Sequence, residues 1–298
     1  MIVLVDASVY VFRAYYSELP DRVDCDGNPV NAVFGFARFL GDLIERLQPR
    51  YVAVAFDQRA ADSYRSRIYP PYKANRNPPP PGLVPQFAIC RELCSHLGVA
   101  GFVNPEFEAD DIIGTLALRM REEGVRSTII TRDKDLAQLV RNGDLFWDFG
   151  ARVQFGYHDI QRHFGVTPER FADYLALTGD EVDNIPGVPG IGHKTAASLM
   201  KEFESLEHLY ACLGQVAGLK IRGAGTLGER LSRHREAVFL SRRLTQIHCD
   251  MQLGVEMEGL RRQAPNLATL GRFYDRLGFG PFLRRQGERL AQLPQRAA

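Results

Sequence analysis

The chain has 298 residues, and its 37 Lys and Arg residues nearly balance its 36 Asp and Glu residues, which leaves a formal net charge of +1. This balance excludes a uniformly basic protein that coats nucleic acid. The 45% hydrophobic and 24% charged content is that of a globular protein of about two domains. No apolar run approaches the roughly 18 to 20 residues that cross a bilayer, so we expect no membrane partner.

The cysteines carry information about the cellular compartment. There are five, an odd number, and no two of them form a CxxC pair. This pattern disfavours both a disulfide framework and a zinc ribbon. We therefore expect reduced thiols and a cytoplasmic location. Separately, we expect the protein to be a monomer.

Short apolar or β-branched runs alternate with longer helical patterns in the first half of the chain. The predicted strands cover residues 2–5, 51–56, 99–103 and 127–130. Residues 31–47 and 110–121 carry apolar side chains at helical spacing, which predicts two helices. The alternation predicts an α/β domain over residues 1–157, with a mostly parallel sheet flanked by helices.

Residues 64–85 interrupt this pattern. The segment holds seven prolines together with Arg65, Arg67, Lys73 and Arg76. Proline at this density disfavours regular helix or strand. Two interpretations stay open, namely a solvated surface connection and a basic loop that overhangs a site.

The strand pattern ends near residue 157, and short helices separated by Gly and Pro follow. The predicted helices cover residues 168–178, 193–203, 227–244 and 267–277. Basic residues concentrate between residues 218 and 243. We therefore predict a second, helical region over residues 158–298.

Acidic residues stand where predicted strands end. Asp6 follows the first strand, Asp57 follows the second, and Asp133 and Asp135 come shortly after the fourth. A single such Asp is commonly a turn former or a helix cap. In an open parallel sheet, however, the carboxyl ends of the strands share one edge, where ligands bind. We therefore expect these acids to converge.

Five further acids extend the set. Glu108, Asp110 and Asp111 open the helix predicted near residue 110, and capping accounts for only one of them. Asp180 and Asp183 lie in the turn before a Gly/Pro-rich segment. Nine carboxylates in one place would repel one another unless cations neutralise them.

The type of ligand atom indicates the type of metal. The set contains only carboxylate oxygens, which favours Mg²⁺ or Mn²⁺ over zinc or copper. Two such ions about 4 Å apart suit in-line displacement at phosphorus. The acids alone therefore predict a metal-dependent phosphodiesterase.

Residues 187–196 read GVPGIGHKTA, with Gly187, Gly190 and Gly192 on a tight turn before a helix. Glycine allows close backbone approach, the first N–H groups of a helix lack partners, and Lys194 beside Thr195 adds a charge. A DNA phosphate could be held there without any base being read. The alternative is a Gly-capped turn between helices. The string lacks the spacing of a nucleotide P-loop.

The proline-rich segment offers a second group of phosphate ligands. Arg65, Arg67, Lys73 and Arg76 alternate with tyrosines that include Tyr72. The cations can hold phosphates and the aromatic faces can stack on unpaired bases, or the tyrosines can pack on the domain surface. Lys73 is the candidate for stabilising charge on a scissile phosphate.

Six short strings of this sequence occur together, in the same order, in one known family. They cover residues 3–6, 55–57, 72–76, 107–111, 131–135 and 179–192. On these strings the chain resembles the bacterial 5′→3′ exonuclease and flap endonuclease family, which includes the amino-terminal nuclease domain of DNA polymerase I and free-standing phage and bacterial nucleases. The resemblance covers nearly the whole chain.

The resemblance implies a PIN-like nuclease core with two metal ions. One ion would be held mainly by Asp6, Asp57, Glu108, Asp110 and Asp111, and the other mainly by Asp133, Asp135, Asp180 and Asp183. It also implies an arch over the site near residues 64–85, with Lys73 and Arg76 at its base. A DNA-gripping helix-hairpin near residues 179–203 would accept K⁺. Arg13 is similar to a basic position near the scissile phosphate.

The expected activity is therefore Mg²⁺-dependent hydrolysis of DNA at 5′ ends and 5′ flaps, as in primer removal and repair. Lys73, Asp6, Asp57 and Asp135 are the expected catalytic residues. Because the chain has no room for a polymerase domain, a polymerase partner would act in trans. The alternatives are a scaffold that binds branched DNA without cutting it, and a PIN-like ribonuclease.

Overall fold

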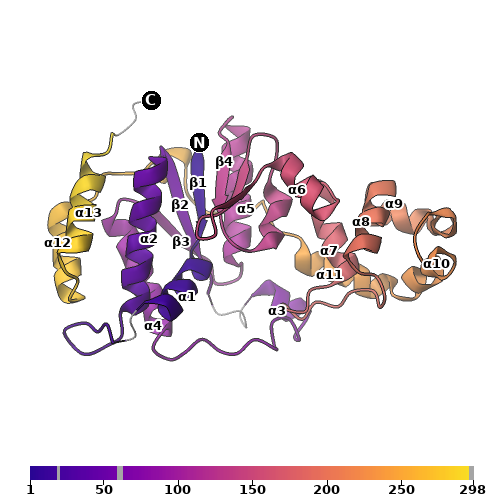
Figure 1. Ribbon diagram of the computed structural model, residues 1–298, viewed down its shortest axis with the longest axis horizontal. Coiled ribbons are helices and arrows are strands. Elements are labelled where there is room, and N and C mark those ends of the chain that lie inside the picture. The colour runs from indigo at the N-terminus through magenta and orange to yellow at the C-terminus, as the bar shows by residue number, and fades with distance from the viewer. Residues whose placement is uncertain (19–20, 59–62, 295–298) are drawn as a thin grey trace.

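A computed structural model describes residues 1–18, 21–58 and 63–294. Its centre is a six-stranded sheet (Figure 1). The strands are β1 (Ile2–Asp6), β2 (Tyr51–Phe56), β3 (Ala100–Val103), β4 (Ser127–Ile130), β5 (Leu145–Asp148) and β6 (Val153–Phe155). Their spatial order is β3-β2-β1-β4-β5-β6, and every neighbouring pair is parallel except β5 and β6.

This strand order determines where a ligand can bind. The chain moves outward from β1 to β2 and β3, and then returns to place β4 on the other side of β1. Such a reversal opens a crevice outside the carboxyl ends of the two central strands. Asp6 ends β1, and residues 131–135 follow β4, so the predicted acids border this crevice.

Both faces of the sheet are covered, because alternate residues of β1 pack into different cores. Ile2 and Leu4 face the core that contains α5 (Ala109–Glu122) and α7 (Phe171–Thr178), whereas Val3 and Val5 face α2 (Asn31–Leu47) and α4 (Val84–His96). Burial on both faces explains the continuous apolar runs in the sequence.

The remaining helices fall into two groups along the chain. The first half of the chain contains α1 (Ala7–Ser17), α3 (Tyr64–Ile68) and a 3₁₀ helix, η2 (Lys134–Leu139). Those in the second half are α6 (Tyr157–Phe164), η3 (Pro168–Arg170), α8 (His193–Glu202), α9 (Leu206–Ala211), η4 (Leu213–Gly218), α10 (Ala224–Arg233), α11 (Arg235–Thr245), η5 (Met257–Leu260), α12 (Leu267–Arg276) and α13 (Pro281–Gln292). No helix in the described ranges is long and apolar enough to span a bilayer.

Two sequence predictions are corrected by the observed helices. The single helix expected over residues 227–244 is two helices, because the backbone leaves helical geometry at His234 between α10 and α11. The proline-rich segment contains the short helix α3, whose first turn is capped by the Ser63 side chain accepting from the Ser66 N–H at 3.3 Å. α4 begins at Val84, before the last of the seven prolines.

The last two helices return to the first half of the chain. Leu270, Phe273 and Leu283 belong to the core that α2 and α4 share, and Figure 1 places α12 and α13 at the opposite end of the molecule from α8, α9 and α10. The helical region that is continuous in sequence is therefore not continuous in space. The division at residue 157 stays a prediction.

Candidate active site

The ends of the two central strands are joined by hydrogen bonds between side chains. Asp6 is 3% exposed, and its Oδ2 accepts from Thr131 Oγ1 at 2.8 Å. The same Thr131 oxygen accepts from the Asp133 N–H at 2.9 Å, and Asp133 Oδ1 accepts from the Asp135 N–H at 2.9 Å. Thr131, which sequence reasoning did not single out, thus orients the acids after β4.

The second strand is tied to α5 in the same manner. Asp57 follows β2, is exposed, and its Oδ1 accepts from the Ala109 N–H at 2.9 Å. This bond satisfies one of the N–H groups that the start of a helix leaves without partners. It also brings Asp57 to the first turn of α5, where Asp110 lies.

These carboxylates are close enough to disturb one another's protonation. Burial, followed by the charge of Asp57, raises the pKa of Asp6 to about 7. Burial and the neighbouring Asp133 raise the pKa of Asp110 well above its usual range, and the pKa of Asp135 is raised by the same two causes. Mutual repulsion at this sheet edge is what a bound cation would relieve.

The donor atoms fit a divalent ion of the Mg²⁺ type. The acids supply only oxygens, and buried Glu108 Oε1 and Asp135 Oδ1 have no hydrogen-bond partner. Among the residues that the structure describes, no three His, Cys, Asp or Glu side chains already stand in a geometry that would hold one ion. The acids therefore lie close enough to affect one another's pKa, but the described side chains do not form a complete coordination shell.

Lys73 lies at the border of this acid cluster. Its Nζ lies 3.1 Å from Glu108 Oε2 and 3.8 Å from Asp183 Oδ2, and its backbone N–H donates to the Asp183 carbonyl at 2.9 Å. Burial opposes the charged ammonium, but Glu108 and Asp183 outweigh it and raise the pKa of Lys73. Lys73 adopts a left-handed backbone with φ +54°, an unusual conformation for a non-glycine residue.

The acids of the later turn are paired with cations. Arg76 forms an ion pair with Asp183, and Lys134 forms one with Asp180. Burial alone would raise the pKa of Asp180, but the Lys134 ammonium reverses this and lowers it. Asp180 Oδ1 also accepts from the Asp183 N–H at 3.2 Å, so the turn is held by the carboxylate that the sequence assigned to a metal.

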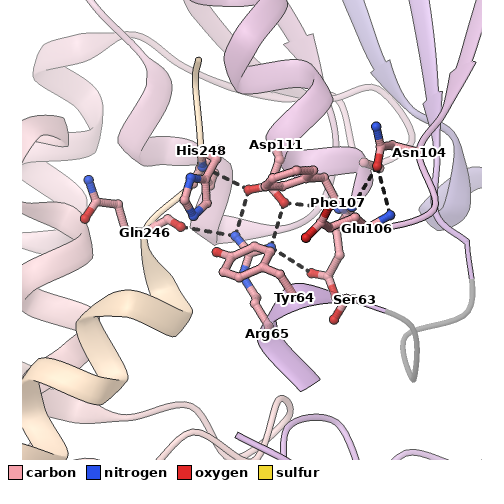
Figure 2. A network of polar contacts seen from close by, with 12 residues as sticks. Ser63, Tyr64, Arg65, Asn104, Glu106, Phe107, Asp111, Gln246 and His248 are labelled. Atoms are coloured by element: carbon pink, nitrogen blue, oxygen red, sulfur yellow. Dashed lines mark hydrogen bonds and ion pairs between the residues drawn. The ribbon is translucent and has the colours of Figure 1, made fainter. Parts of the chain in front are cut away.

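Asp111 is placed differently from the other predicted metal ligands. It is fully buried, and its two oxygens accept from both terminal nitrogens of Arg65 at 2.7 and 2.8 Å. Asp111 also accepts from the His248 and Glu108 N–H groups at 2.9 and 3.1 Å (Figure 2). Asp111 is thus paired with a buried protein cation, whereas Asp180 is paired with the partly exposed Lys134.

Arg65 is correspondingly not a phosphate ligand. It is 3% exposed, its Nε donates to the Leu244 carbonyl at 2.8 Å, and its Nη2 donates to the Gln246 carbonyl at 3.1 Å. Arg65 and Asp111 therefore join α3, the start of α5 and the end of α11.

Tyr72 and Arg13 lie in different surroundings. Tyr72 is 5% exposed, and its hydroxyl donates to Glu108 Oε2 at 3.0 Å, so its ring is not available for stacking on a base. Arg13 lies against Gly150 in the turn between β5 and β6, where a Cβ on the glycine would overlap the guanidinium. The backbone has room for Arg13 only because residue 150 is glycine.

The Gly-rich segment is a turn between α7 and α8, as expected. Gly179 and Gly187 approach so closely that a Cβ on either would meet backbone atoms at 2.4 Å or less. Gly190 has φ +77°, Gly192 caps α8, and the exposed Lys194 and partly exposed Thr195 lie in the first turn of that helix. This geometry leaves helix N–H groups open to an anion.

Comparison with known proteins matches this architecture in two consecutive parts. Residues 1–165 match the family model of the 5′-3′ exonuclease N-terminal resolvase-like domain, and residues 166–268 match that of the 5′-3′ exonuclease C-terminal SAM fold. The chain belongs to the 5′-3′ exonuclease family. The resemblance and the fold class expected from sequence are confirmed.

The similar curated proteins are longer than this family member. The chain is 39% identical over 287 residues to the thermostable DNA polymerase I of Thermus thermophilus, covering 96% of the chain and 33% of that protein. It is 36% identical to the DNA polymerase I of Rhizobium leguminosarum, covering 96% of the chain and 28% of the relative. The chain thus spans about a third of the length of these relatives.

Solved structures share the fold at low sequence identity. The T5 5′-exonuclease with divalent metal ions (zinc) bound superposes with a TM-score of 0.66 at 19% identity, with 98% of each chain covered. The catalytic core of Rad2 in complex with DNA substrate gives a TM-score of 0.62 at 16% identity, covering 98% of this chain and 91% of the other.

Proposed function

We propose that the chain is a divalent-metal-dependent nuclease that hydrolyses DNA phosphodiester bonds at 5′ ends and 5′ flaps. The observation that carries this proposal is the group of mutually repelling acids at the ends of β1, β2 and β4, in a member of the 5′-3′ exonuclease family. The proposal is also supported by two solved structures of the same fold, one with divalent metal ions bound and one in complex with DNA substrate.

In this proposal two Mg²⁺ or Mn²⁺ ions are held by eight acids. The first group is Asp6, Asp57, Glu108 and Asp110, and the second is Asp133, Asp135, Asp180 and Asp183. When bound, such ions supply activation of water and charge stabilisation at the scissile phosphate. Asp111 is omitted because its oxygens are already used by Arg65 and backbone N–H groups.

The remaining residues position the DNA. The Lys73 ammonium pairs with Glu108, whose same oxygen accepts from the Tyr72 hydroxyl, and would face the scissile phosphate once an ion replaces it as the partner of the acids. Arg76 is 45% exposed on its side chain and would hold the 5′ strand beside Lys73. Gly187, Gly190, Gly192, Lys194 and Thr195 would grip the duplex backbone, with K⁺ as a possible ligand of the same turn.

The biological setting is part of the same proposal. DNA polymerase I is the similar protein in several bacteria, which favours primer removal and repair as the processes served. A polymerase would act in trans with this chain as a monomer in the cytoplasm. A non-cutting scaffold does not explain why carboxylates crowd together beside Lys73. A ribonuclease could use the same acids, and DNA is favoured over RNA by the family and by the Rad2 core in complex with DNA substrate.

One digestion tests these alternatives together. The substrates are a 5′-labelled DNA flap, a nicked duplex, a blunt duplex and a single-stranded RNA, each with Mg²⁺, with Mn²⁺ and with EDTA. We expect metal-dependent products from the flap and the nick. Binding without products in every metal would establish the scaffold, and cleavage of RNA in preference to the flap would establish the ribonuclease.

A further inference from the structure

One cavity in the described part of the chain has no catalytic acid in its lining. It has a volume of about 550 Å³ and is formed by α1, α2 and the turn after β5. Four arginines line it, namely Arg13, Arg38, Arg46 and Arg152. Pockets that bind small molecules commonly have volumes of about 300 to 1,000 Å³.

Most of the positive charge in this cavity is not neutralised by the protein. Arg38 forms an ion pair with Glu18 at 2.6 Å. The structure gives Arg13, Arg46 and Arg152 no carboxylate partner among the residues that it describes. Asp42 is the other acid in the lining. Four cations against two acids leave an excess of +2, which favours an anion.

An aromatic group forms the inner wall. Tyr10 and Phe39 stack with ring centres 4.0 Å apart and planes 7° apart, and Phe149 meets Phe39 edge to face at 5.7 Å. The Arg46 guanidinium lies 5.7 Å from the centre of the Phe149 ring. Phe39 and Phe149 are only partly buried, so their surfaces reach the cavity.

We propose that this cavity binds a nucleotide unit, with its phosphate on the arginines and its base against Phe39 and Phe149. Arginine matches phosphate oxygens with paired N–H donors, and aromatic rings stack on bases without selecting a sequence. The nucleotide can be a free nucleoside monophosphate or one residue of a DNA strand. The site goes beyond the proposed function, because no catalytic acid lines it.

The test measures binding by calorimetry in EDTA, where metal-dependent cutting cannot contribute. The probes are 5′-dAMP, a twelve-residue oligothymidylate, deoxyadenosine and inorganic phosphate. Arg46→Ala and Arg152→Ala are the pocket variants. Arg272→Ala removes an exposed arginine of α12 outside the cavity and is the matched control, and Lys73→Ala tests for binding at the arch instead.

We expect each pocket variant to weaken binding of the nucleotide probe by about tenfold, because a hydrogen bond to a charged group is lost. The Arg272→Ala protein should bind both nucleotide probes as the unaltered chain does, and Lys73→Ala should weaken 5′-dAMP binding by less than either pocket variant does. Tenfold weakening seen with 5′-dAMP identifies a free nucleotide as the occupant. The same weakening seen only with the oligothymidylate identifies a strand.

Three results would overturn the proposal. The first is unchanged binding of both nucleotide probes by the pocket variants. The second is a loss in Lys73→Ala equal to that in Arg46→Ala, which places the probe at the arch. The third is inorganic phosphate binding as tightly as 5′-dAMP, which leaves no role for the base. Because cutting is not measured, failure of the nuclease proposal would not affect this readout.

Discussion

Two adjacent carboxylates at the start of α5 have opposite surroundings. Asp110 is partly exposed and faces Asp6, Asp57 and Asp133, which raise its pKa together with burial. Asp111 is fully buried and shared between the Arg65 guanidinium and two backbone N–H groups. The sequence string EADD thus contains one carboxylate that faces other carboxylates and one that is paired with a cation of the protein.

The comparison teaches that the number of acids in a motif is not the number of ligands. Successive helix positions differ by about 100°, so Asp110 and Asp111 project from the same turn in different directions. Asp110 lies near Asp6, Asp57 and Asp133 at the sheet edge, whereas Asp111 meets Arg65 of α3, which also bonds to α11 (Figure 2). Exchanging each carboxylate for its amide separates the two roles.

The largest effect is expected from Asp110→Asn. Removing a charge that faces the proposed ions should lower the single-turnover cutting rate of a 5′ flap by about a thousandfold or more, since the metals are asked to supply most of the rate. Binding of the same flap in Ca²⁺ should change less than twofold. Cutting within tenfold of the unaltered rate would remove Asp110 from the proposed ligand set.

Asp111→Asn should act on stability instead. It removes the bidentate carboxylate partner of the buried Arg65 and leaves only Glu108 Oε2, 3.4 Å from Arg65 Nη1, so the free energy of unfolding in urea should fall by about 3 kcal/mol. Adding Arg65→Met to this variant should recover part of that loss by removing a buried charge that Glu108 alone compensates poorly. A stable Asp111→Asn protein whose melting temperature no longer rises with Mg²⁺ would instead make Asp111 a ligand.

Lys73→Ala tests the cation that pairs with Glu108 and Asp183 at the border of the acid cluster. Loss of a positioned cation should lower the single-turnover rate by about a hundredfold while DNA affinity in Ca²⁺ changes little. Arg67→Ala, which removes an exposed arch arginine paired with Glu106, is the matched control and should cut normally. If affinity falls as far as rate does, Lys73 holds the strand and does not assist the chemical step.

The smallest expected effect is a change in folding stability in Asp6→Asn, and this change depends on pH. Without metal, the native chain holds a proton on Asp6 up to a pKa of about 7, whereas the unfolded chain releases it near 3.8. The stability that this proton contributes is present at low pH and is lost as pH rises through 7.

Asn carries no charge at any pH and avoids that loss. In EDTA at pH 8, Asp6→Asn should therefore be about 1 to 2 kcal/mol more stable than the unaltered chain, and about equally stable at pH 4.5. Mg²⁺ should raise the melting temperature of the unaltered chain at pH 8 and raise that of the variant less. A variant less stable than the unaltered chain at pH 8 contradicts the unpaired carboxylate.

Local patterns predicted the sheet well. The helix over residues 31–47 lies where its helical periodicity predicts it, and the strands at 51–56 and 127–130 lie where continuous apolar or β-branched runs predict strands buried on both faces. β5 and β6 were missed, since their short runs resemble other loop-flanked apolar segments. The break at His234 carries no Pro or Gly signal that would divide α10 from α11.

The sequence by itself determined the first four of the six strands in order, the acids at the strand ends and the family. These depend on periodicity and on chain order, which are local properties. Only the tertiary structure decided which acid faces which, because Arg65 reaches Asp111 across 46 residues and Leu244 across 179. The arginine-lined cavity likewise exists only where α1, α2 and the turn after β5 meet, and no local pattern encodes that meeting.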